Sequence, residues 1–429
     1  MLSTQRGRRV VVTGMGAITP LGRDVASLWE GLLAGRSGVT TLAALTEAGF
    51  STDFGGLSPE VEIDELLAGE HRRLRKYVGR KEALALAAAA QAVRQANLAP
   101  GAGRPERFGV TIGTEAGRPE LPEVAAAFLR HLDKGDPLED YLALDPLSLL
   151  RGTPNLIQGL LAILHDARGP GLTVSTACTS SGQAVGEAFL KIRDGLADVM
   201  LTGGADLLVE PFMLTGFTLL GALSTRRDRP QQASRPFDKD RDGFVLADGA
   251  GFLVLEELRR AEARGARPLA EVIGYGSSLN AYRITDSPPD GAGALEAMQA
   301  ALASAGILPQ DVDYINAHGT STKMNDPAEA RAIHRLYAGS PLGPPPVSSA
   351  KSQLGHLVAA CGSVEAIVCA RALATGLLPP TINVTELDPE VDLDVLAEGP
   401  RPGAIRIALS NSFGFGGSNA SLVLRRFPR

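Results

Sequence analysis

Short runs rich in β-branched residues alternate along this chain with longer segments of helical periodicity. The strand-like runs include RVVVTGMG, RFGVTIGT, ADVMLTGGAD and GFLVLEEL, and the helix-like segments are EALALAAAAQAVRQAN and LEAMQAALASAG, which ends at Gly306. Such alternation is typical of α/β proteins in which helices cover the sheets. We therefore predict an α/β protein with largely buried sheets.

Two segments share one order of elements. VSTACTSSGQAVGEAFLKIRDG and VSSAKSQLGHLVAACGSVEAIVCARALATG, which starts at Val347, each have the pattern strand, small polar turn, amphipathic helix and glycine stop. Their sequences are too dissimilar to prove a repeat, but the shared order indicates two similar halves. We place the break in the charged segment RRAEARGARP, which divides the 429 residues into 1–265 and 266–429.

Composition argues against several classes of protein. A formal net charge of -6 disfavours a general nucleic-acid-binding protein. The three cysteines lack framework spacing, so a disulfide scaffold is not expected and a reducing cytoplasm is the default. The start, MLSTQRGRRVVVTGMG, does not have the pattern of a signal peptide, and apolar runs such as ALALAAAA stop short of a membrane span.

Cys178 lies among small polar residues where a strand passes into a helix. The apolar face of that helix consists of Val185, Ala188, Phe189 and Ile192. Unpaired N–H groups and the helix dipole favour an anion at such a start, so the pKa of the thiol can fall enough to make it nucleophilic. From the residues alone, a small cysteine that only packs is an open alternative, and Cys361 and Cys369 are interpreted in that way.

Two other polar segments follow strands. In NAHGTSTKMNDPAE, His318 comes directly after a strand, and a histidine that bonds its own loop carbonyls is the alternative to a functional one. In SAKSQLGHLVAACGSVEAI, Lys351 and His356 precede a helix that carries Glu365. This pattern suggests a buried polar network, whereas an exposed loop lysine is the alternative for Lys351.

Other motifs are incomplete. TGMGAI lacks the third glycine of a dinucleotide-binding turn, and GFGFGG lacks the GKS/T of a P-loop. The histidines have no metal-ligand spacing, so no metal is expected. A papain-like hydrolase would use a cysteine and a histidine, but it predicts neither the lysine nor GFGFGG.

Four motifs, TACTSS, NAHGTST, AKSQLGH and NSFGFGGSN, resemble in order and spacing the β-ketoacyl-acyl-carrier-protein synthases, in particular the elongating type II enzymes of fatty-acid synthesis. The resemblance extends from VVVTGMGAITPLG at Val10 to the C-terminus. It implies the thiolase fold, with two similar halves in five α-β-α-β-α layers, and a homodimer. It also implies an acyltransferase without a cofactor, whose substrates are carried on the phosphopantetheine of acyl carrier protein.

The resemblance implies roles for residues of this chain. Cys178 matches the nucleophile that accepts the acyl chain, His318 and His356 match the pair that supports decarboxylation of malonyl carrier protein, and Lys351 matches a buried lysine. The remaining matches are Glu365 and Asp326 (supporting network), Phe415 and Phe413 (gate and, through backbone N–H, oxyanion hole), Thr320, Thr322 and Thr285 (pantetheine), and Ala116 and Phe217 (acyl pocket).

By the same resemblance, the basic segment HRRLRKYVGRKE is expected to lie roughly in the region where the family docks its acidic carrier protein. Its basic residues are Arg72, Arg73, Arg75, Lys76, Arg80 and Lys81. Electrostatic steering favours docking, and a solvated helix face is the alternative.

Departures from the family leave alternatives open. Relatives often have a bulky residue in a GSGIGG-like loop where GTEAGRP has Ala116, so we expect a deeper pocket or one that reaches toward a partner. A ketosynthase of a dissociated polyketide or polyene pathway is the nearest alternative. A non-catalytic chain-length partner subunit is disfavoured by Cys178 and both histidines. A coenzyme A thiolase is disfavoured because NSFGFGGSN replaces its second cysteine. Homodimer and heterodimer stay open.

Overall fold

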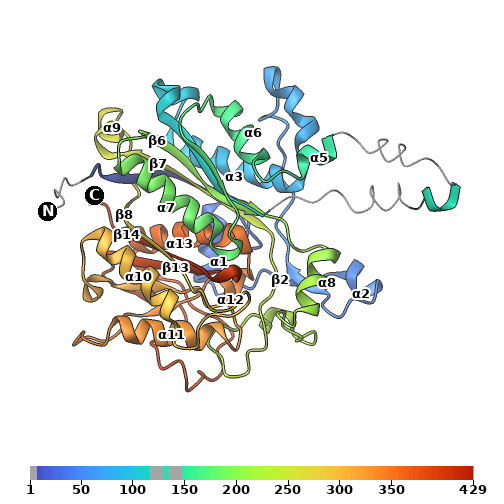
Figure 1. The fold of residues 1–429 in the computed structure, drawn as a ribbon, viewed down its shortest axis with the longest axis vertical. Coiled ribbons are helices and arrows are strands. Elements are labelled where there is room, and N and C mark those ends of the chain that lie inside the picture. Colours follow the sequence, from blue (N-terminus) through green and yellow to red (C-terminus); the bar gives the residue numbers. More distant parts are fainter. Residues whose placement is uncertain (1–6, 116–128, 130, 135–146, 429) are drawn as a thin grey trace.

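The computed structural model describes residues 7–115, 129, 131–134 and 147–428. Ten strands are hydrogen-bonded in the order β10-β9-β13-β14-β8-β1-β7-β6-β4-β5. The two five-stranded halves of this array join where residues 10–12 of β1 pair with residues 270–272 of β8. Away from this seam the halves separate into two layers, with α7 and α13 between them (Figure 1).

The two halves have one topology. The strands of the first half are β1 (Val10–Ile18), β4 (Phe108–Gly113), β5 (Gly171–Val174), β6 (Val199–Asp206) and β7 (Gly249–Glu257). Those of the second are β8 (Ala270–Leu279), β9 (Tyr314–Asn316), β10 (Val347–Ser348), β13 (Ile407–Phe413) and β14 (Ser418–Arg425). In each half the strands, numbered along the chain, lie in the order 1-5-4-2-3, with two antiparallel pairings followed by two parallel ones. The prediction of two similar halves is confirmed, while their boundary at residue 265 stays a prediction.

Helices supply the other three layers. The helices of these layers are α3 (Arg80–Ala96) and α6 (Leu156–His165) on the outer face of the first half, α7 (Ser180–Arg193) and α13 (Cys361–Thr375) in the centre, and α10 (Ala292–Ala305) and α11 (Asn325–Leu336) on the second half (Figure 1). Both central helices contact strands of the two halves. The predicted five-layer α/β architecture is therefore confirmed, as are the predicted helices at α3 and α10.

Shorter elements complete the chain. They are α1 (Val25–Leu33), α2 (Ala43–Glu47), α5 (Leu147–Arg151), α8 (Pro211–Leu219), α9 (Leu258–Ala263) and α12 (Lys351–Leu354), with the strand pairs β2 (Val39–Thr41)–β3 (Phe54–Gly56) and β11 (Leu377–Leu378)–β12 (Arg401–Pro402). Two single-turn 3₁₀ segments near the centre are η5 (Ala177–Thr179) and η8 (Val358–Ala360).

Glycine allows the two central helices to approach closely. A Cβ atom at Gly362, in the first turn of α13, would lie 2.6 Å from the backbone nitrogen of Gly182 in α7. Because a side chain there would force the helices apart, this contact fixes the distance between their N-terminal ends. The segments that carry Cys178 and His356 lead into these ends, so the contact also positions both residues.

One apolar stretch is longer than the sequence analysis expected. Residues 358–375 are long and apolar enough to span a membrane by length and composition, so the expectation that all apolar runs stop short was wrong in this respect. In the fold, 83% of the stretch is buried inside the protein. Its apolar character is accounted for by its place between the two halves.

Candidate active site

Cys178 lies in η5, the single turn between β5 and α7, where the sequence predicted it. Ala177, directly before it, has φ of +51°, which is uncommon for a residue with a Cβ. The turn is held by polar contacts: the N–H of Thr176 donates to Ser180 Oγ (2.8 Å), and the N–H of Ala177 donates to Glu115 Oε1 (3.0 Å). The chain thus presents the cysteine at the start of α7.

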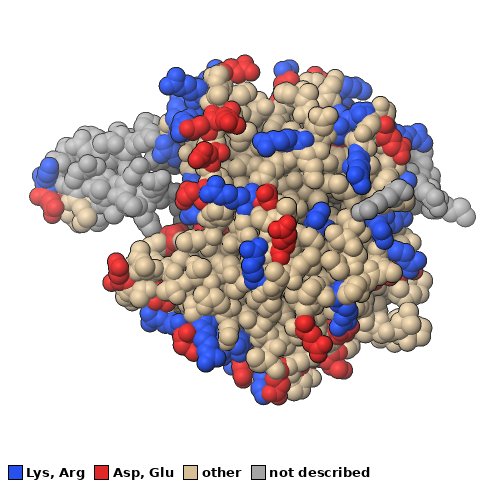
Figure 2. Space-filling model, turned by 180° about the vertical axis from the view of Figure 1, so that it is seen from behind, with Lys and Arg blue, Asp and Glu red and all other residues tan. Residues whose placement is uncertain are grey.

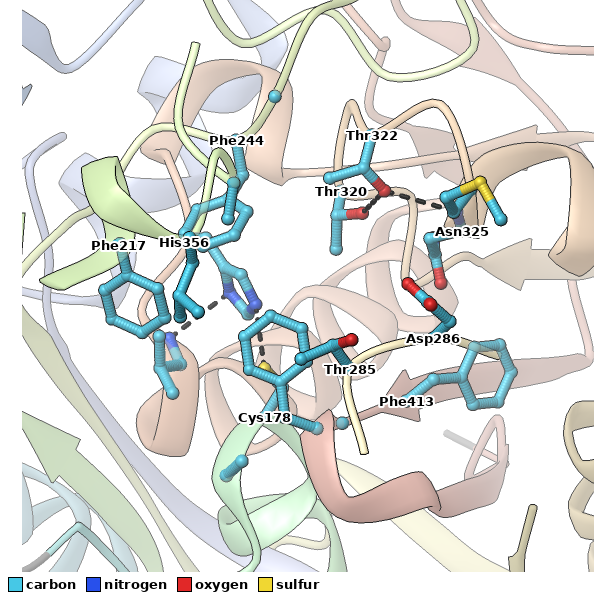
Figure 3. Close-up of a pocket in the computed structure, with 18 of the residues that line it drawn as sticks. Cys178, Phe217, Phe244, Thr285, Asp286, Thr320, Thr322, Asn325, His356 and Phe413 are labelled. Carbon is cyan, nitrogen blue, oxygen red and sulfur yellow. Dashed lines mark hydrogen bonds between the residues drawn. The ribbon is translucent and has the colours of Figure 1, made fainter. Parts of the chain in front are cut away.

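His356 reaches Cys178 from the other central segment. Its Nε2 lies 3.1 Å from Cys178 Sγ, and its Nδ1 accepts the backbone N–H of Val358 at 3.2 Å. An Nδ1 that accepts cannot carry a proton in the neutral ring, so the proton resides on Nε2 and points to the sulfur. Figure 3 shows the two side chains facing each other.

His318 completes a compact group with these two residues. Its ring centroid lies 5.4 Å from that of His356, and one ligand atom from each of the three side chains lies within 4.8 Å of the others. Among the described residues its Nδ1 has no hydrogen-bond partner although it is buried. Such a set could geometrically hold a metal ion, but the positive charge of Lys351 nearby disfavours a cation there.

Lys351 is buried with an exposed fraction of 2% and forms an ion pair with Glu365, which is equally buried. The alternative of an exposed loop lysine is therefore wrong. Burial is the largest single effect and works against the charge of Lys351, but the combined interactions with Glu365 and the other acidic groups nearby outweigh it and raise the pKa of Lys351. The lysine consequently stays cationic next to the two histidines.

Both histidines are held neutral. Burial, followed by repulsion from Lys351, lowers the pKa of His318 and of His356 well below the usual value. Neutral imidazoles can donate an N–H to an oxygen on which negative charge develops. The site therefore contains two potential neutral donors next to a thiol.

The expectation that the start of the helix lowers the pKa of the Cys178 thiol was wrong. Burial raises the pKa of Cys178 to about 12, against the opposing effects of Lys351 and the backbone N–H of Phe415. The cost of desolvating a charged sulfur here exceeds what the helix start supplies. Cys178 is thus a protonated thiol in the unliganded protein.

The GFGFGG loop approaches the nucleophile closely. A Cβ atom at Gly414 would lie 3.2 Å from the nitrogen of Cys178, so glycine is required for this approach. The backbone N–H groups of Phe415 and of Cys178 itself both act on the sulfur. Two N–H groups at one nucleophile can form an oxyanion hole.

A cavity of about 500 Å³ opens onto the sulfur. Its lining includes Cys178, both histidines, Thr320, Thr322, Thr285, Phe217, Phe413 and Phe415. Phe217 stacks on Phe415 with centroids 6.3 Å apart, and the ring of Phe413 contacts His318 at 5.6 Å. Figure 3 shows Phe217 on one side and Thr320 and Thr322 on the other. Ala116 lies outside the described residues.

Asp326 supports a different element from Glu365. Its buried carboxylate accepts the N–H groups of Thr320 (3.0 Å) and Ser321 (3.2 Å) and lies 3.6 Å from Arg241. It therefore shapes the threonine loop, while Glu365 pairs with Lys351.

Two family models match the chain. They are "Beta-ketoacyl synthase, N-terminal domain" over residues 7–261 and "Beta-ketoacyl synthase, C-terminal domain" over residues 269–385. The chain belongs to the β-ketoacyl synthase family. The resemblance stated from its four motifs is thereby confirmed.

Relatives of this β-ketoacyl synthase match over nearly their whole length. The 3-oxoacyl-[acyl-carrier-protein] synthase 2 of Vibrio cholerae is 41% identical, over 98% of this chain and 99% of the relative. The solved ishigamide ketosynthase/chain length factor is 36% identical with a TM-score of 0.85, over 98% and 100% of the two chains. A ketosynthase in complex with its type II PKS acyl-carrier protein is 34% identical with a TM-score of 0.86 and the same coverage.

The basic segment divides into two groups in this β-ketoacyl synthase. Arg80 donates to the carbonyl of Ser58 (2.9 Å), and Lys81 donates to that of Glu115 (3.0 Å). Their charged ends are thus engaged with the fold, while their place in the docking surface stays a prediction.

The four other basic residues lie on the surface. Arg72 and Arg73 are exposed, Arg75 pairs with Asp64, and Lys76 lies 5.1 Å from the ring centre of Tyr77. On the face shown in Figure 2, basic and acidic side chains are interspersed.

Sequence reasoning missed two carboxylates. Glu329 is buried and accepts the backbone N–H groups of His318 (2.9 Å) and Gly319 (2.8 Å), which fixes the histidine loop. Glu115 contacts the turn before Cys178. Each acid stands in a quoted motif, but only the three-dimensional contacts assign it a partner.

Proposed function

We propose that this protein condenses an acyl chain, held as a thioester on Cys178, with malonyl-acyl carrier protein, giving β-ketoacyl-acyl carrier protein and CO2. The observation that carries this proposal is the neutral His356 Nε2–H at 3.1 Å from Cys178 Sγ, with His318 beside it at the end of a cavity. Thiol and histidines come from three distant segments, which is the arrangement that the reaction needs.

In the first step the sulfur of Cys178 attacks the acyl thioester. The carbonyl oxygen gains negative charge, and the N–H groups of Phe415 and Cys178 stabilise it. The carbon–sulfur bond to the carrier breaks, and the proton of the Cys178 thiol ends on the departing phosphopantetheine thiol. Lys351 and the two N–H groups supply the charge stabilisation that the buried sulfur needs during transfer.

In the second step the malonyl thioester loses CO2. The electrons of the broken carbon–carbon bond form an enolate, whose oxygen accepts N–H groups from His318 and His356. One such donor can contribute about 3 kcal/mol of transition-state stabilisation. The enolate carbon then attacks the acyl thioester of Cys178, a carbon–carbon bond forms as the carbon–sulfur bond breaks, and Cys178 departs as a thiolate that takes up a proton from water.

The cavity lining supports roles for the remaining residues. Thr320 and Thr322, whose hydroxyls are 3.0 Å apart, and Thr285 would hold the pantetheine arm. Phe415, with Phe413 two residues before it in the chain, would gate access to an acyl pocket bounded by Phe217. Ala116 would deepen that pocket, so a phenylalanine at position 116 would shorten the accepted chains.

Acyl carrier protein is the proposed partner, docked at Arg72, Arg73, Arg75 and Lys76. The solved complex of a relative with its acyl-carrier protein supports a carrier as partner. A homodimer is proposed, with a heterodimer as the alternative, because one neighbour contains a ketosynthase and a chain length factor. We further propose halves at 1–265 and 266–429 and a cytoplasmic location, which the three free cysteines support.

Fatty-acid elongation is the proposed pathway, because relatives named 3-oxoacyl-[acyl-carrier-protein] synthase 2 match at about 40% identity over nearly their whole length. A polyketide or polyene pathway is the second candidate, favoured by the solved neighbours. A carrier series tests both: purified protein is incubated with malonyl carrier and acyl carriers of saturated or polyene chains.

A saturated β-ketoacyl product, detected by mass spectrometry, supports elongation. Reaction with polyene chains alone supports the second candidate. Absence of any condensation product with every carrier would contradict the proposed function.

A further inference from the structure

Glu115 places a carboxylate against the turn that carries the nucleophile. Its Oε1 accepts the N–H of Ala177 at 3.0 Å and lies 3.4 Å from Ser180 Oγ, while its Oε2 accepts the hydroxyl of Ser175 at 3.2 Å. Three residues around Cys178 thus contact one side chain. Glu115 also lines the cavity that opens onto Cys178.

The contacted backbone is the unusual part of the turn. Ala177 adopts φ of +51°, a left-handed conformation that a residue with a Cβ rarely takes without support. Its N–H donates to the carboxylate. Without that acceptor the N–H would lose its partner, and the turn could relax toward ordinary backbone angles.

Glu115 is itself anchored. Its backbone carbonyl accepts the ammonium of Lys81 at 3.0 Å. Its neighbour Thr114 donates its N–H to Val174 (3.1 Å) and its hydroxyl to Ala205 (2.9 Å). The carboxylate therefore fixes the turn relative to the sheet.

We propose that Glu115 is a positioning residue for Cys178, whose carboxylate holds the left-handed backbone at Ala177 and so aims the sulfur and its N–H at the acyl thioester. This inference rests on the proposed function of Cys178 as acyl acceptor.

The charge of Glu115 provides a second readout. Lys351, His318, His356, Cys361 and Glu115 surround Cys178. Glu115 raises the pKa of Cys178 and Lys351 lowers it, both after the larger effect of burial. Glu115→Gln keeps an oxygen that can accept the Ala177 N–H but removes the charge. The pKa of Cys178 should then fall, and its alkylation by iodoacetamide at a given pH should become faster.

The experiment compares Glu115→Ala, Glu115→Gln and the exposed control Glu296→Ala with the parent protein. Two rates are measured in each: acyl transfer from acyl carrier protein to Cys178, and CO2 release from malonyl carrier protein. A misaimed nucleophile costs about tenfold or more, so Glu115→Ala should lose that much acyl transfer while CO2 release stays within about twofold. Glu115→Gln should retain acyl transfer and show faster alkylation, and Glu296→Ala should match the parent.

Three outcomes would overturn the proposal: normal acyl transfer in Glu115→Ala, equal loss of both rates in that variant, or a Glu115→Gln variant as poor as Glu115→Ala. If the alanine variant does not fold, slow acyl transfer or unchanged alkylation in a folded Glu115→Gln variant overturns it. A parent protein that transfers no acyl group would instead contradict the proposed function, so the two failures are distinguishable.

Discussion

His356 Nε2 lies 3.1 Å from Cys178 Sγ, while the backbone N–H of Val358 donates to the other ring nitrogen, Nδ1, at 3.2 Å. The backbone thereby fixes which nitrogen carries the proton. In this tautomer the ring is a hydrogen-bond donor toward the cavity and not a base. The account of decarboxylation follows from this assignment.

Removal of that donor should slow decarboxylation. We expect His356→Ala to lower the rate of CO2 release from malonyl carrier protein by about 10²- to 10³-fold, since one oxyanion donor is lost. The rate is followed by mass spectrometry of the carrier. His165→Gln, on α6 away from the cavity, is the control and should leave the rate unchanged. A His356→Ala variant with the parent rate would refute the donor role.

Decarboxylation should not follow the ordinary titration of histidine. Burial and Lys351 hold the pKa of His318 and His356 well below the usual value, so both rings stay neutral donors as the pH falls through about 6.5. CO2 release by a Cys178→Gln variant, measured from about pH 8 to pH 6, should therefore be nearly constant. A decline with a midpoint near pH 6.5 would show that the rings titrate normally.

The same lowered pKa values affect stability. Below about pH 6.5 the unfolded chain binds protons at these histidines and the folded chain does not. The free energy of unfolding should therefore decrease as the pH falls below that value. Urea unfolding at a series of pH values measures this free energy. The variants His318→Gln and His356→Gln each lack one titrating ring, so the free energy of unfolding should decrease less in them as the pH falls.

Lys351 links stability to the histidines. Lys351→Met leaves Glu365 buried without its partner, which should lower the free energy of unfolding by about 3–5 kcal/mol. Loss of the positive charge should also raise the pKa of both histidines, so CO2 release in this variant should decline at low pH. Urea unfolding and the pH profile measure the two effects.

A surface ion pair provides the matched control for Lys351. Lys239 pairs with Glu386, and both side chains are largely exposed, so Lys239→Met should leave the free energy of unfolding nearly unchanged. Equal destabilisation by the two lysine variants would contradict the buried charge account.

Much of the architecture could be predicted from the sequence, but the pKa values of the site residues could not. The recurring strand–turn–helix order predicted two similar halves, because the type and order of the elements can be inferred from the spacing of hydrophobic residues, which is a local property of the sequence. The pKa of Cys178 was predicted in the wrong direction because burial depends on segments far away, such as the His356 loop. The contact of Glu115 with Ala177 joins residues 62 positions apart, so it could not be predicted from a local sequence pattern.

The site residues divide in the same way. The position of Cys178 at the start of α7 followed from the apolar face of that helix. The engagement of Arg80 and Lys81 did not, because a basic run looks the same whether its charges meet solvent or carbonyl groups. Motif order indicated the proximity of the thiol and the histidines only through family resemblance, since sequence spacing alone carries no contact.

Docking should be electrostatic and confined to protein-borne substrates. We expect the double variant Arg72→Glu and Arg73→Glu to raise KM for acyl carrier protein about tenfold, with a smaller effect at high salt, because like charges would then repel the acidic partner. Its rate with a short pantetheine thioester should equal that of the parent. Arg168→Glu, an exposed position paired with Asp166, is the control. An unchanged KM would place the docking surface elsewhere.

Intact-mass measurement after incubation with acyl carrier protein tests the central claim most directly. The parent protein should gain a single acyl group, Cys178→Ala should gain none, and Cys361→Ala and Cys369→Ala should gain it as the parent does. An acyl group retained by Cys178→Ala would contradict the assignment of this sulfur as the acceptor.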